Sequence, residues 1–345
     1  MQILMHNKFS KYIMIGICLI FSSKSFSQLD QVAQELGLFL NDAVFYSDKY
    51  ITPATDAAVY QSSSNWMTSP KKRKLFDVTL SVHGNVFFVP KSDRSFEISN
   101  SDFSFFTIQD ANSQNISSAI VPTTLGGSEK YYLVGSIAGN QVKIQTPKGV
   151  DSEQIIYPYL QGSIALWKGF EVVTKYSTKV KLKKGDYQVY GLGLKHNFSQ
   201  YINSLTANKI HLAALVSYSK EDISFDFLDV QTDYGNLGID RISGLVDTYQ
   251  FQISGSKEWK NFELMLSSIT NTSDFKYKLS GKRGSIEDVI PVQQIFNDRL
   301  KQIYKTKING FTEISGRYQF SKIYVQTTIA FGKFVNSNLS VQYEF

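Results

Sequence analysis

Four lysines share the polar face of two neighbouring predicted strands, and their spacing suggests an anion-binding stripe. Lys175, Lys179 and Lys181 fall on one face of the first strand, and Lys195 lies in the second. An ammonium group donates to carboxylate and phosphate oxygens, so these side chains could hold the head group of an anionic amphiphile whose tail rests on apolar neighbours. Two other interpretations stay open. The lysines could simply be solvated, or they could pair with acids of the preceding helical segment, namely Asp30, Glu35, Asp42 and Asp48.

The sequence gives little support for catalysis or for a metal site. His196 and His211 fall near the ends of adjacent predicted strands, but no serine or aspartate stands beside them as a nucleophile or an orienting group. The other histidine of the mature chain is His83, and the single cysteine is Cys18, so a tetrahedral zinc site is not expected. We therefore predict that the protein is not an enzyme and uses no cofactor and no metal.

The second of these strands, "YGLGLKHNF" at residues 190–198, raises a question about its inner face. Apolar side chains alternate with Gly191, Gly193 and Lys195. Glycine inside a strand often marks the close approach of another backbone, so both glycines are expected to face a segment packed against this strand. They do not form a dinucleotide-binding fingerprint, because the motif lies within a strand and opens no helix.

The remainder of the chain predicts an all-β fold. Aromatic residues make up 14% of the sequence, and they favour pleated surfaces. Runs with a period of two residues, separated by Gly, Asn, Asp and Lys turns, predict about fourteen strands after residue 74. These strands are expected at residues 75–90, 95–109, 130–137, 141–147, 154–166, 170–182, 186–198, 208–219, 221–231, 246–257, 261–280, 305–319, 322–332 and 338–345.

A soluble β-sandwich shows the same alternation, but the connections and strand ends favour a transmembrane antiparallel barrel of about 14 strands (12–14). Short connections at residues 183–185, 219–221 and 320–321 alternate with longer ones at 199–208, 231–247 and 281–304, as expected for periplasmic turns and outer loops. Aromatic residues near strand ends match the belts at membrane interfaces; these are Tyr157, Trp167, Trp259 and Tyr343.

The last strand carries a more specific signal. The chain ends on "NLSVQYEF", with Leu339, Val341, Tyr343 and Phe345 on one face. This ending resembles the assembly signal of outer-membrane barrels, so Phe345 is expected to engage the barrel-assembly machinery. Inside such a barrel, Glu313 and Arg317 share an inward face and are expected to pair with each other or across the lumen.

The first residues predict export. Residues 1–27 combine basic residues, an apolar core and a small-x-small site, which is typical of a secretory signal, so the mature chain is expected to start at Gln28. Cys18 leaves with the signal. Loss of Lys8, Lys11 and Lys24 lowers the net charge from +6 to about +3, and a charge this small argues against nucleic-acid binding.

A helical segment connects the signal to the barrel. Apolar residues at spacings of three and four over residues 29–43 predict an amphipathic helix, and a second short helix is expected to begin at Pro53. We expect residues 28–70 to fold into the lumen as a plug, facing Gly191 and Gly193, and residues 71–345 to form the barrel.

The stretches "YGLGLKHNFSQYI" and "HLAALVSYSK", together with this helical segment, resemble an uncharacterised family of outer-membrane barrels from Bacteroidota-type bacteria. More distantly, the chain is similar to the FadL-like long-chain fatty-acid transporters, which have fourteen strands and an N-terminal hatch. Their hatch usually carries Asn-Pro-Ala, of which Thr52-Pro53-Ala54 keeps only Pro-Ala.

Together these features predict a monomeric outer-membrane channel or transporter for small, hydrophobic or anionic amphiphilic molecules. Its expected partners are outer-membrane lipid, a small amphiphilic ligand and the barrel-assembly machinery. The alternative is a structural or accessory subunit of a larger outer-membrane complex that transports nothing.

Overall fold

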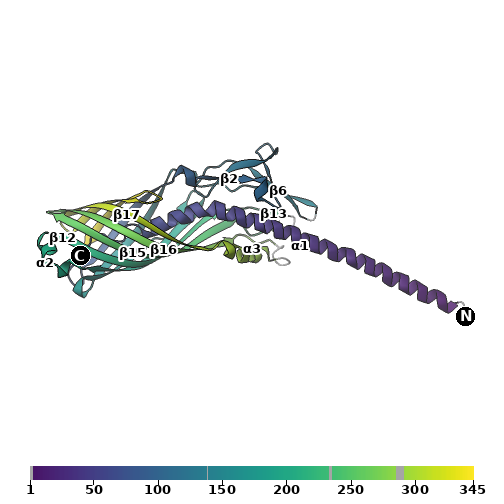
Figure 1. Ribbon diagram of the computed structural model, residues 1–345, viewed down its shortest axis with the longest axis horizontal. Helices are drawn as coiled ribbons and strands as arrows, with labels where there is room; N and C mark the ends of the chain where they lie inside the picture. The colour runs from purple at the N-terminus through teal and green to yellow at the C-terminus, as the bar shows by residue number, and fades with distance from the viewer. Residues whose placement is uncertain (1–2, 138, 233–234, 285–290) are drawn as a thin grey trace.

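The computed structural model describes residues 3–137, 139–232, 235–284 and 291–345, and it shows a closed antiparallel barrel entered by one long helix (Figure 1). Within these residues, ten strands close the barrel, because the last strand pairs with the first. In barrel order they are β1 (Val78–Phe88), β8 (Gln154–Ala165), β9 (Phe170–Tyr176), β11 (Gly185–Asn197), β12 (Ile210–Asp226), β15 (Arg241–Trp259), β16 (Phe262–Ser280), β17 (Lys305–Phe320), β18 (Ile323–Phe331) and β19 (Asn336–Glu344). A short extra strand, β10 (Val180–Leu182), pairs with the first residues of β11.

The expected count of fourteen strands was wrong, for two reasons. Residues 95–109, 130–137 and 141–147 form short strands outside the barrel. Residues 208–219 and 221–231 are not separated by a turn, because β12 runs without interruption through Lys220 and Glu221. The charged pair looked like a turn, but Glu221 is a buried, inward-facing residue of the strand. Alternation of polar and apolar residues cannot distinguish a half-buried strand of a small sheet from a strand that spans a membrane.

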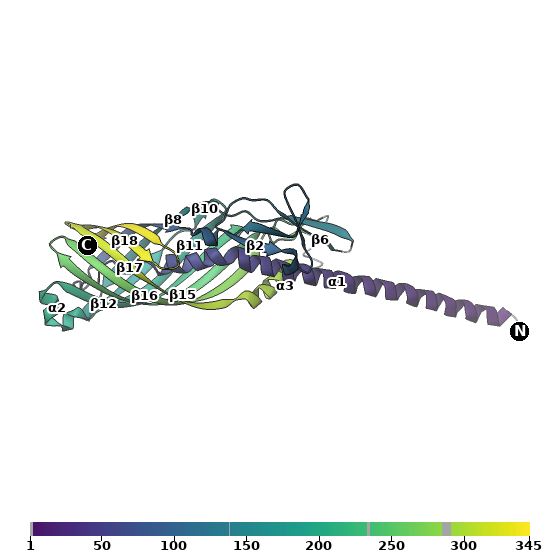
Figure 2. The same ribbon diagram turned by 45° about the horizontal axis from the view of Figure 1, so that its top comes forward.

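The connection between β1 and β8 forms a separate small unit, which we call the cap (residues 89–153). One of its two sheets contains β2 (Ser95–Ser99) and β5 (Ser118–Pro122), and the other contains β4 (Asn115–Ile116), β3 (Thr107–Gln109), β6 (Tyr132–Ile137) and β7 (Asn140–Gln145). Two short 3-10 turns flank β2: η1 (Lys91–Asp93) lies between β1 and β2, and η2 (Asn100–Asp102) lies between β2 and β3. Figure 2 shows the cap beyond the barrel rim, beside the long helix.

The two ends of the barrel differ in their connections. At the end that holds the C-terminus, which we call the short-turn end, the connections are residues 166–169, 198–209, 260–261 and 321–322, and they carry η3 (Trp167–Gly169), η4 (Ser199–Tyr201) and α2 (Asn203–Ala207). The opposite, long-loop end carries the cap, the hairpin of β10, a loop with β13 (Gln231–Thr232) and β14 (Gly235–Asn236), the loop with α3 (Val292–Leu300) and η6 (Lys301–Ile303), and residues 332–335.

Two of the expected connections therefore lie at the end opposite to the one predicted. Residues 199–208, expected as an outer loop, belong to the short-turn end. Residues 183–185, expected as a periplasmic turn, join β10 to β11 at the long-loop end. Connection length at a single position is a weak guide to the side of the membrane, whereas the whole set still separates the two ends.

The outer surface of the barrel is apolar over a band, as expected where lipid is the solvent. Exposed aliphatic and aromatic side chains face outward on every strand of the barrel, among them Leu80, Leu160, Tyr176, Leu192, Val216, Phe251, Leu266, Ile314, Ile329 and Leu339. Near the short-turn end this band is bordered by exposed aromatic residues, including Trp167, Tyr201, Trp259, Phe320, Tyr343 and Phe345. Tyr157, expected in such a belt, instead lies inside and packs against Tyr187, with 4.5 Å between ring centroids.

Three strands continue beyond this band at the long-loop end. On β12, β15 and β16 the outward tyrosines Tyr218 and Tyr249 are followed by charged residues, and the pairing register aligns Lys220, Asp247 and Asp274. The carboxylate of Asp247 pairs with the ammonium group of Lys276 at 3.4 Å. A row of outward-facing charges does not belong in hydrocarbon, so these strands protrude from the membrane at this end.

One continuous helix, α1 (Ile3–Ser63), replaces the two helices that were expected. Pro53 lies inside this helix. The proline is tolerated because the neighbouring turns are tightly packed: Tyr50, Ile51 and Ala54 are fully buried. The helix ends at Ser63, and Asn65 adopts a positive φ of 61°, which is a common way to terminate a helix. No helix in the described part of the chain is long and apolar enough to cross a membrane.

Candidate functional site

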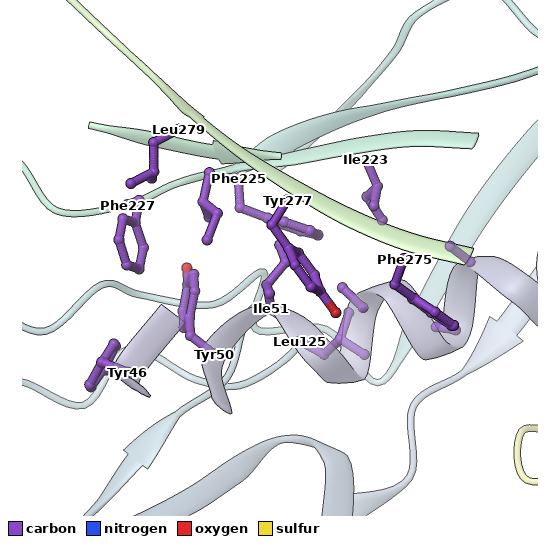
Figure 3. Close-up of a cluster of buried hydrophobic side chains, with 14 of the residues drawn as sticks. Tyr46, Tyr50, Ile51, Leu125, Ile223, Phe225, Phe227, Phe275, Tyr277 and Leu279 are labelled. Atoms are coloured by element: carbon purple, nitrogen blue, oxygen red, sulfur yellow. The ribbon is translucent and has the colours of Figure 1, made fainter. Parts of the chain in front are cut away.

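The lumen is occupied by the last part of α1 and by the chain that follows it to β1, residues 39–74, which we call the plug. Its upper part, residues 39–60, packs at the long-loop end against barrel and cap residues in one apolar cluster. Figure 3 shows Tyr46, Tyr50 and Ile51 of the helix facing Phe225, Phe227 and Tyr277 of the surrounding strands and loops. The ring centroids of Tyr50 and Phe227 are 5.6 Å apart. This half of the plug is held mainly by burial of apolar surface.

Polar groups fix the orientation of this upper part. The hydroxyl of Tyr50 donates to the carbonyl oxygens of Lys148 at 2.9 Å and Asp226 at 3.1 Å. Burial raises the pKa of Tyr50, and the nearby charge of Asp226 raises it further, so the hydroxyl stays a donor. The carboxylate of Asp42 accepts hydrogen bonds from the backbone N–H groups of the cap residues Ser104, Phe105 and Phe106, at distances between 2.7 and 3.0 Å.

The acids of the helix pair with lysines other than those expected. The carboxylate of Asp48 pairs with Lys305 at 2.8 Å, and the carboxylate of Asp56 pairs with Lys307 at 2.5 Å and with Lys333 at 3.0 Å. Partial burial alone would lower the pKa of Lys333, but the hydrogen bond and the charge of Asp56 raise it above its ordinary value. These ion pairs join the helix to the rim of the barrel.

The lower part of the plug is held by polar side chains of the wall, and Lys175 is central to it. The Nζ atom of Lys175 donates to the carbonyl oxygens of Ser62 at 3.0 Å and Ser64 at 2.6 Å, at the C-terminal end of α1. A cation at this end of a helix is favourable because the carbonyl groups there have no partner within the helix and carry partial negative charge. The Nε1 atom of Trp66 also donates to the carbonyl of Ser62, at 2.7 Å.

An acid on the opposite wall completes this contact. The Oε1 atom of Glu313 accepts a hydrogen bond from the backbone N–H of Asn65 at 2.8 Å. The ammonium group of Lys175 lies over the rings of Trp66 and Tyr159, 4.7 and 4.8 Å from their centroids. Both Lys175 and Glu313 are 1% exposed, so they act on the plug in a place without bulk water. We call Lys175, Glu313 and their contacts with residues 62–66 the latch.

Gly191 and Gly193 lie directly against the plug at Trp66. A Cβ atom on Gly193 would lie 3.3 Å from Cε3 of Trp66, and one on Gly191 would lie 2.8 Å from Cη2. The same Cβ atom on Gly191 would also lie 2.6 Å from the carbonyl oxygen of Tyr218. The indole therefore occupies the space that side chains at these two positions would need.

A second polar cluster closes the lumen at the short-turn end. We call it the mouth network, and its members are Arg73, Glu171, Lys195, Glu263, Arg317 and Glu344. Lys195 pairs with Glu171, and its Nζ atom donates to the carbonyl of Ser69 at 2.9 Å. Arg73 pairs with Glu171 at 2.7 Å and with Glu344 at 3.0 Å. The network thus ties the last residues of the plug to the wall with opposite charges.

Arg317 does not pair with Glu313 in the same strand. Its guanidinium contacts Glu344 of β19 at 2.6 Å and Glu263 of the adjacent strand β16 at 3.5 Å. Glu313 points to the plug instead, as described for the latch. The two residues are four apart on one face, but they belong to different clusters at different depths of the lumen.

The structure does not bring the four lysines of the proposed stripe together. Lys175 and Lys195 are buried in the lumen, in the latch and in the mouth network. Lys179 and Lys181 are exposed, because the strand expected at residues 170–182 is interrupted after Tyr176 and β10 is a separate hairpin arm. Lys179 pairs with Asp186 at 3.2 Å. The continuous alternation of residues 170–182 concealed this break.

The histidines are spread over different environments. His83 is buried, stacks on Tyr159 with 4.5 Å between ring centroids, and bridges Ser81 and Asn338. The hydroxyl of Ser81 also donates to the carbonyl of Gln161 at 3.2 Å, and the whole group is enclosed by the plug and the wall. His211 pairs with Glu258 at 3.2 Å near the short-turn end. Among the described residues, no group of His, Cys, Asp and Glu is arranged to hold a metal ion.

Sequence reasoning missed most of the residues that hold the plug. Trp66 follows the amphipathic stretch and carried no periodic signal, and Arg73 was one member of the basic run at residues 71–74. Glu171 and Glu263 stand at inward positions of β9 and β16, where alternation alone could have placed them. Their pairing across the lumen depends on the barrel order, which the sequence did not provide.

Comparisons with known proteins show the family of this chain. A family model described as a family of unknown function (DUF6588) matches residues 5–345. No curated protein is similar in sequence. Among solved structures, the chain is similar to the translocator domain of the autotransporter NalP from Neisseria meningitidis, with 7% identity, a TM-score of 0.34, and coverage of 87% of this chain and 98% of that one.

Two further solved structures give comparable values. An outer membrane channel from Pseudomonas putida F1 has 11% identity and a TM-score of 0.27, covering 79% of this chain and 97% of that one. A loop-deletion mutant of OmpT, an outer membrane protein of Vibrio cholerae, has 8% identity and a TM-score of 0.20, covering 78% and 99%. Likenesses this low do not transfer an activity to this chain.

Proposed function

The chain belongs to DUF6588, a family of unknown function, and we propose from its own geometry that it is an outer-membrane channel closed by its N-terminal plug. The observation that carries this proposal is the way in which the plug is held. Its upper part is fixed mainly by the large apolar cluster, with ion pairs at the rim, whereas residues 62–73 have only a small apolar cluster at Trp66 and Met67 and are otherwise held by hydrogen bonds and ion pairs from the wall. Water and ligands can replace polar contacts of this kind, so the lower segment is the part that can move.

The proposed location rests on the barrel and on the first residues. A closed barrel with an apolar outer band satisfies its backbone groups between strands and can span a bilayer. The signal predicted at residues 1–27 would deliver the chain to the periplasm, and the exposed C-terminal Phe345 would engage the barrel-assembly machinery. Outer-membrane lipid is then the solvent of the apolar band.

The proposed cargo follows from the groups that the plug covers. When residues 62–73 leave the lumen, Lys175 loses its carbonyl partners and Lys195 loses the carbonyl of Ser69. A carboxylate or phosphate of an anionic amphiphile could replace these oxygens. Barrels of about eight strands are nearly filled by their own side chains, so a lumen only slightly wider admits small molecules. The more distant resemblance to fatty-acid transporters is compatible with this cargo. It was based on the number of strands and on the N-terminal hatch, and the smaller number of strands removes the first of these.

The test compares conductance of the full-length protein with and without the latch. We expect wild-type protein in planar bilayers to be closed, and the variant Lys175→Met with Glu313→Gln to open frequently. The ammonium group that holds the carbonyl oxygens of Ser62 and Ser64 is then lost, and the Asn65 N–H is left with a neutral, weaker acceptor in place of a carboxylate. Lys181→Met, in the exposed hairpin, is the matched control and should stay closed. Lys195→Met is then added to the open variant. We expect this change to remove most of the rate of decanoate uptake and to leave the rate of decanol uptake unchanged.

A structural role is the second candidate, and one observation favours it. The plug and the cap share a single apolar cluster with the barrel, and this packing would hold the cap at a fixed position relative to the barrel. A correctly folded latch variant that stays closed would favour this role over transport. Gentle detergent extraction would then be expected to recover stoichiometric partner proteins.

A further inference from the structure

We propose that the barrel holds its own N-terminal segment threaded across the membrane, so that α1 upstream of Phe39 stands at the cell surface beside the cap. This inference rests on the proposed outer-membrane location, but it does not depend on whether the plug opens or on any cargo.

The direction of α1 in the lumen is the first step. Tyr50 contacts Lys148 of the cap and Asp226 at the end of β12, both at the long-loop end. Trp66 lies sixteen residues later in the chain. It packs with residues near the starts of β9, β12 and β16, and these strands start at the short-turn end; the residues are Val173, Ala213, Leu215 and Met265. The helix therefore enters from the long-loop end and points towards the short-turn end. Figures 1 and 2 show its N-terminal part beyond the cap, with the C-terminus at the opposite end of the barrel.

The second step assigns the two ends to the two sides of the membrane. Outer-membrane barrels have short periplasmic turns and longer extracellular loops. Here the connections at residues 260–261 and 321–322 are tight turns, whereas the cap and the loop with α3 lie at the other end. The outward charges on β12, β15 and β16 also lie at the long-loop end, where the strands leave the lipid. Both observations place the long-loop end outside the cell.

The third step follows the chain. An exported chain reaches the outer membrane from the periplasm, and β1 begins at the short-turn end, on the periplasmic side. The segment before β1 arrives at the outer side through the lumen, so the barrel must pass the segment through or close around it. Residues 67–74, which cross the mouth network, have no helical structure. A non-helical chain is thinner than a helix of about 10–12 Å diameter, so it leaves room for the side chains of the mouth network around it.

The segment thus delivered has a polar surface suited to water. Gln31, Ala33 and Gln34 are exposed, and Val32 and Leu36 are only half-buried. Asp42, one turn and more further on, is already fixed to the amides of the cap. The N-terminal segment and the cap therefore form one surface unit, of which α1 is the stalk.

The experiment uses the lack of cysteine in the sequence after Cys18. In a Cys18→Ala background, single cysteines are placed at Gln34→Cys in the helix, Asn112→Cys in the cap and Lys322→Cys in a short turn, all at exposed positions. Intact cells are treated with a membrane-impermeant maleimide, and disrupted cells serve as the total. Heat-modifiable migration in gels shows that each variant has folded.

We expect Q34C to label in intact cells as strongly as N112C, and at least tenfold more than K322C, which should react only after disruption. Protection of Q34C while N112C is labelled would overturn the threading and leave the location intact. Labelling of K322C with protection of N112C would show that the barrel is inverted. Protection of all three in intact cells would overturn the outer-membrane location together with the inference.

Discussion

The two halves of the plug are held by different forces, and the difference indicates which of them can move. The upper half, around Tyr46 and Tyr50, lies in an apolar cluster that also includes cap residues. The lower half, around Trp66 and Ser69, has a smaller apolar cluster and is held largely by hydrogen bonds and ion pairs from Lys175, Glu313 and the mouth network. Burial of apolar surface has no small replacement, whereas a hydrogen bond can be exchanged for one with water or with a ligand. We therefore treat the upper half as the anchor and the lower half as the gate.

The largest effect is expected from a defect in the anchor. Tyr50→Ala removes a fully buried ring and both of its hydrogen bonds to carbonyl oxygens, so it should lower the free energy of unfolding by about 4 to 5 kcal/mol. Urea unfolding of the protein in lipid vesicles measures this loss. Tyr50→Phe keeps the ring and should cost about 1 to 2 kcal/mol. Equal losses for the two variants would show that polar contacts, and not packing, hold the upper half.

A defect in the gate should destabilise less and should change conductance. Lys175→Met leaves the buried carboxylate of Glu313 without its nearby cation, so a loss of about 3 kcal/mol is expected. The added change Glu313→Gln should recover part of this loss, because the buried charge is then removed as well. A double-mutant cycle in vesicles measures the coupling of the two residues.

Purely additive losses in that cycle would contradict the latch. The same four proteins can be compared in planar bilayers, where Tyr50→Phe serves as a control from the anchor. Opening by the latch variants with no opening by Tyr50→Phe would separate the two halves as the contacts suggest.

The sequence predicted that the strands have one apolar and one polar face, but it did not predict the number of strands in the barrel. Period-two alternation identified each strand of the barrel, because each has one face in lipid and the other in a polar lumen. The same alternation in β2, β3, β6 and β7 comes from small sheets of the cap, so three expected strands do not span the membrane. The single strand β12 was counted as two strands, because Lys220 and Glu221 resemble a turn although β12 is continuous.

The site was predictable only in part, for a physical reason. The glycines at 191 and 193 indicated that a segment lies close to β11, and Lys175 and Lys195 were placed on an inward face. Which partner each lysine meets depends on the depth at which the plug ends, and no local pattern encodes that depth. Lys195 meets Glu171 and a plug carbonyl, not an acid of the helix, because α1 ends above the mouth network.

A smaller effect is expected where the wall touches the gate through shape alone. Gly193→Ala places a Cβ atom 3.3 Å from the indole of Trp66 and 3.2 Å from Cβ of Ser217, so about 1 to 2 kcal/mol should be lost by overpacking. Gly310→Ala is the matched control, because Gly310 is exposed on the outer face and the nearest neighbour of a Cβ atom there would be the backbone oxygen of Ile269, at 3.7 Å. Unfolding in vesicles compares the two. Should Gly310→Ala destabilise as much as Gly193→Ala, the loss belongs to strand glycines in general and not to contact with the plug.

The smallest effect is expected outside both halves, at the exposed lysines. Lys181→Ala should change the free energy of unfolding by no more than about 0.5 kcal/mol, because the side chain is exposed on a short hairpin arm. Lys179→Ala also removes an ion pair with Asp186, in which the lysine side chain is 60% exposed, and such pairs contribute little. Conductance and decanoate uptake of the open latch variant should be the same with or without these changes. A clear loss of uptake with either one would mean that the anion path includes the outer hairpin, and that Lys175 and Lys195 alone do not define it.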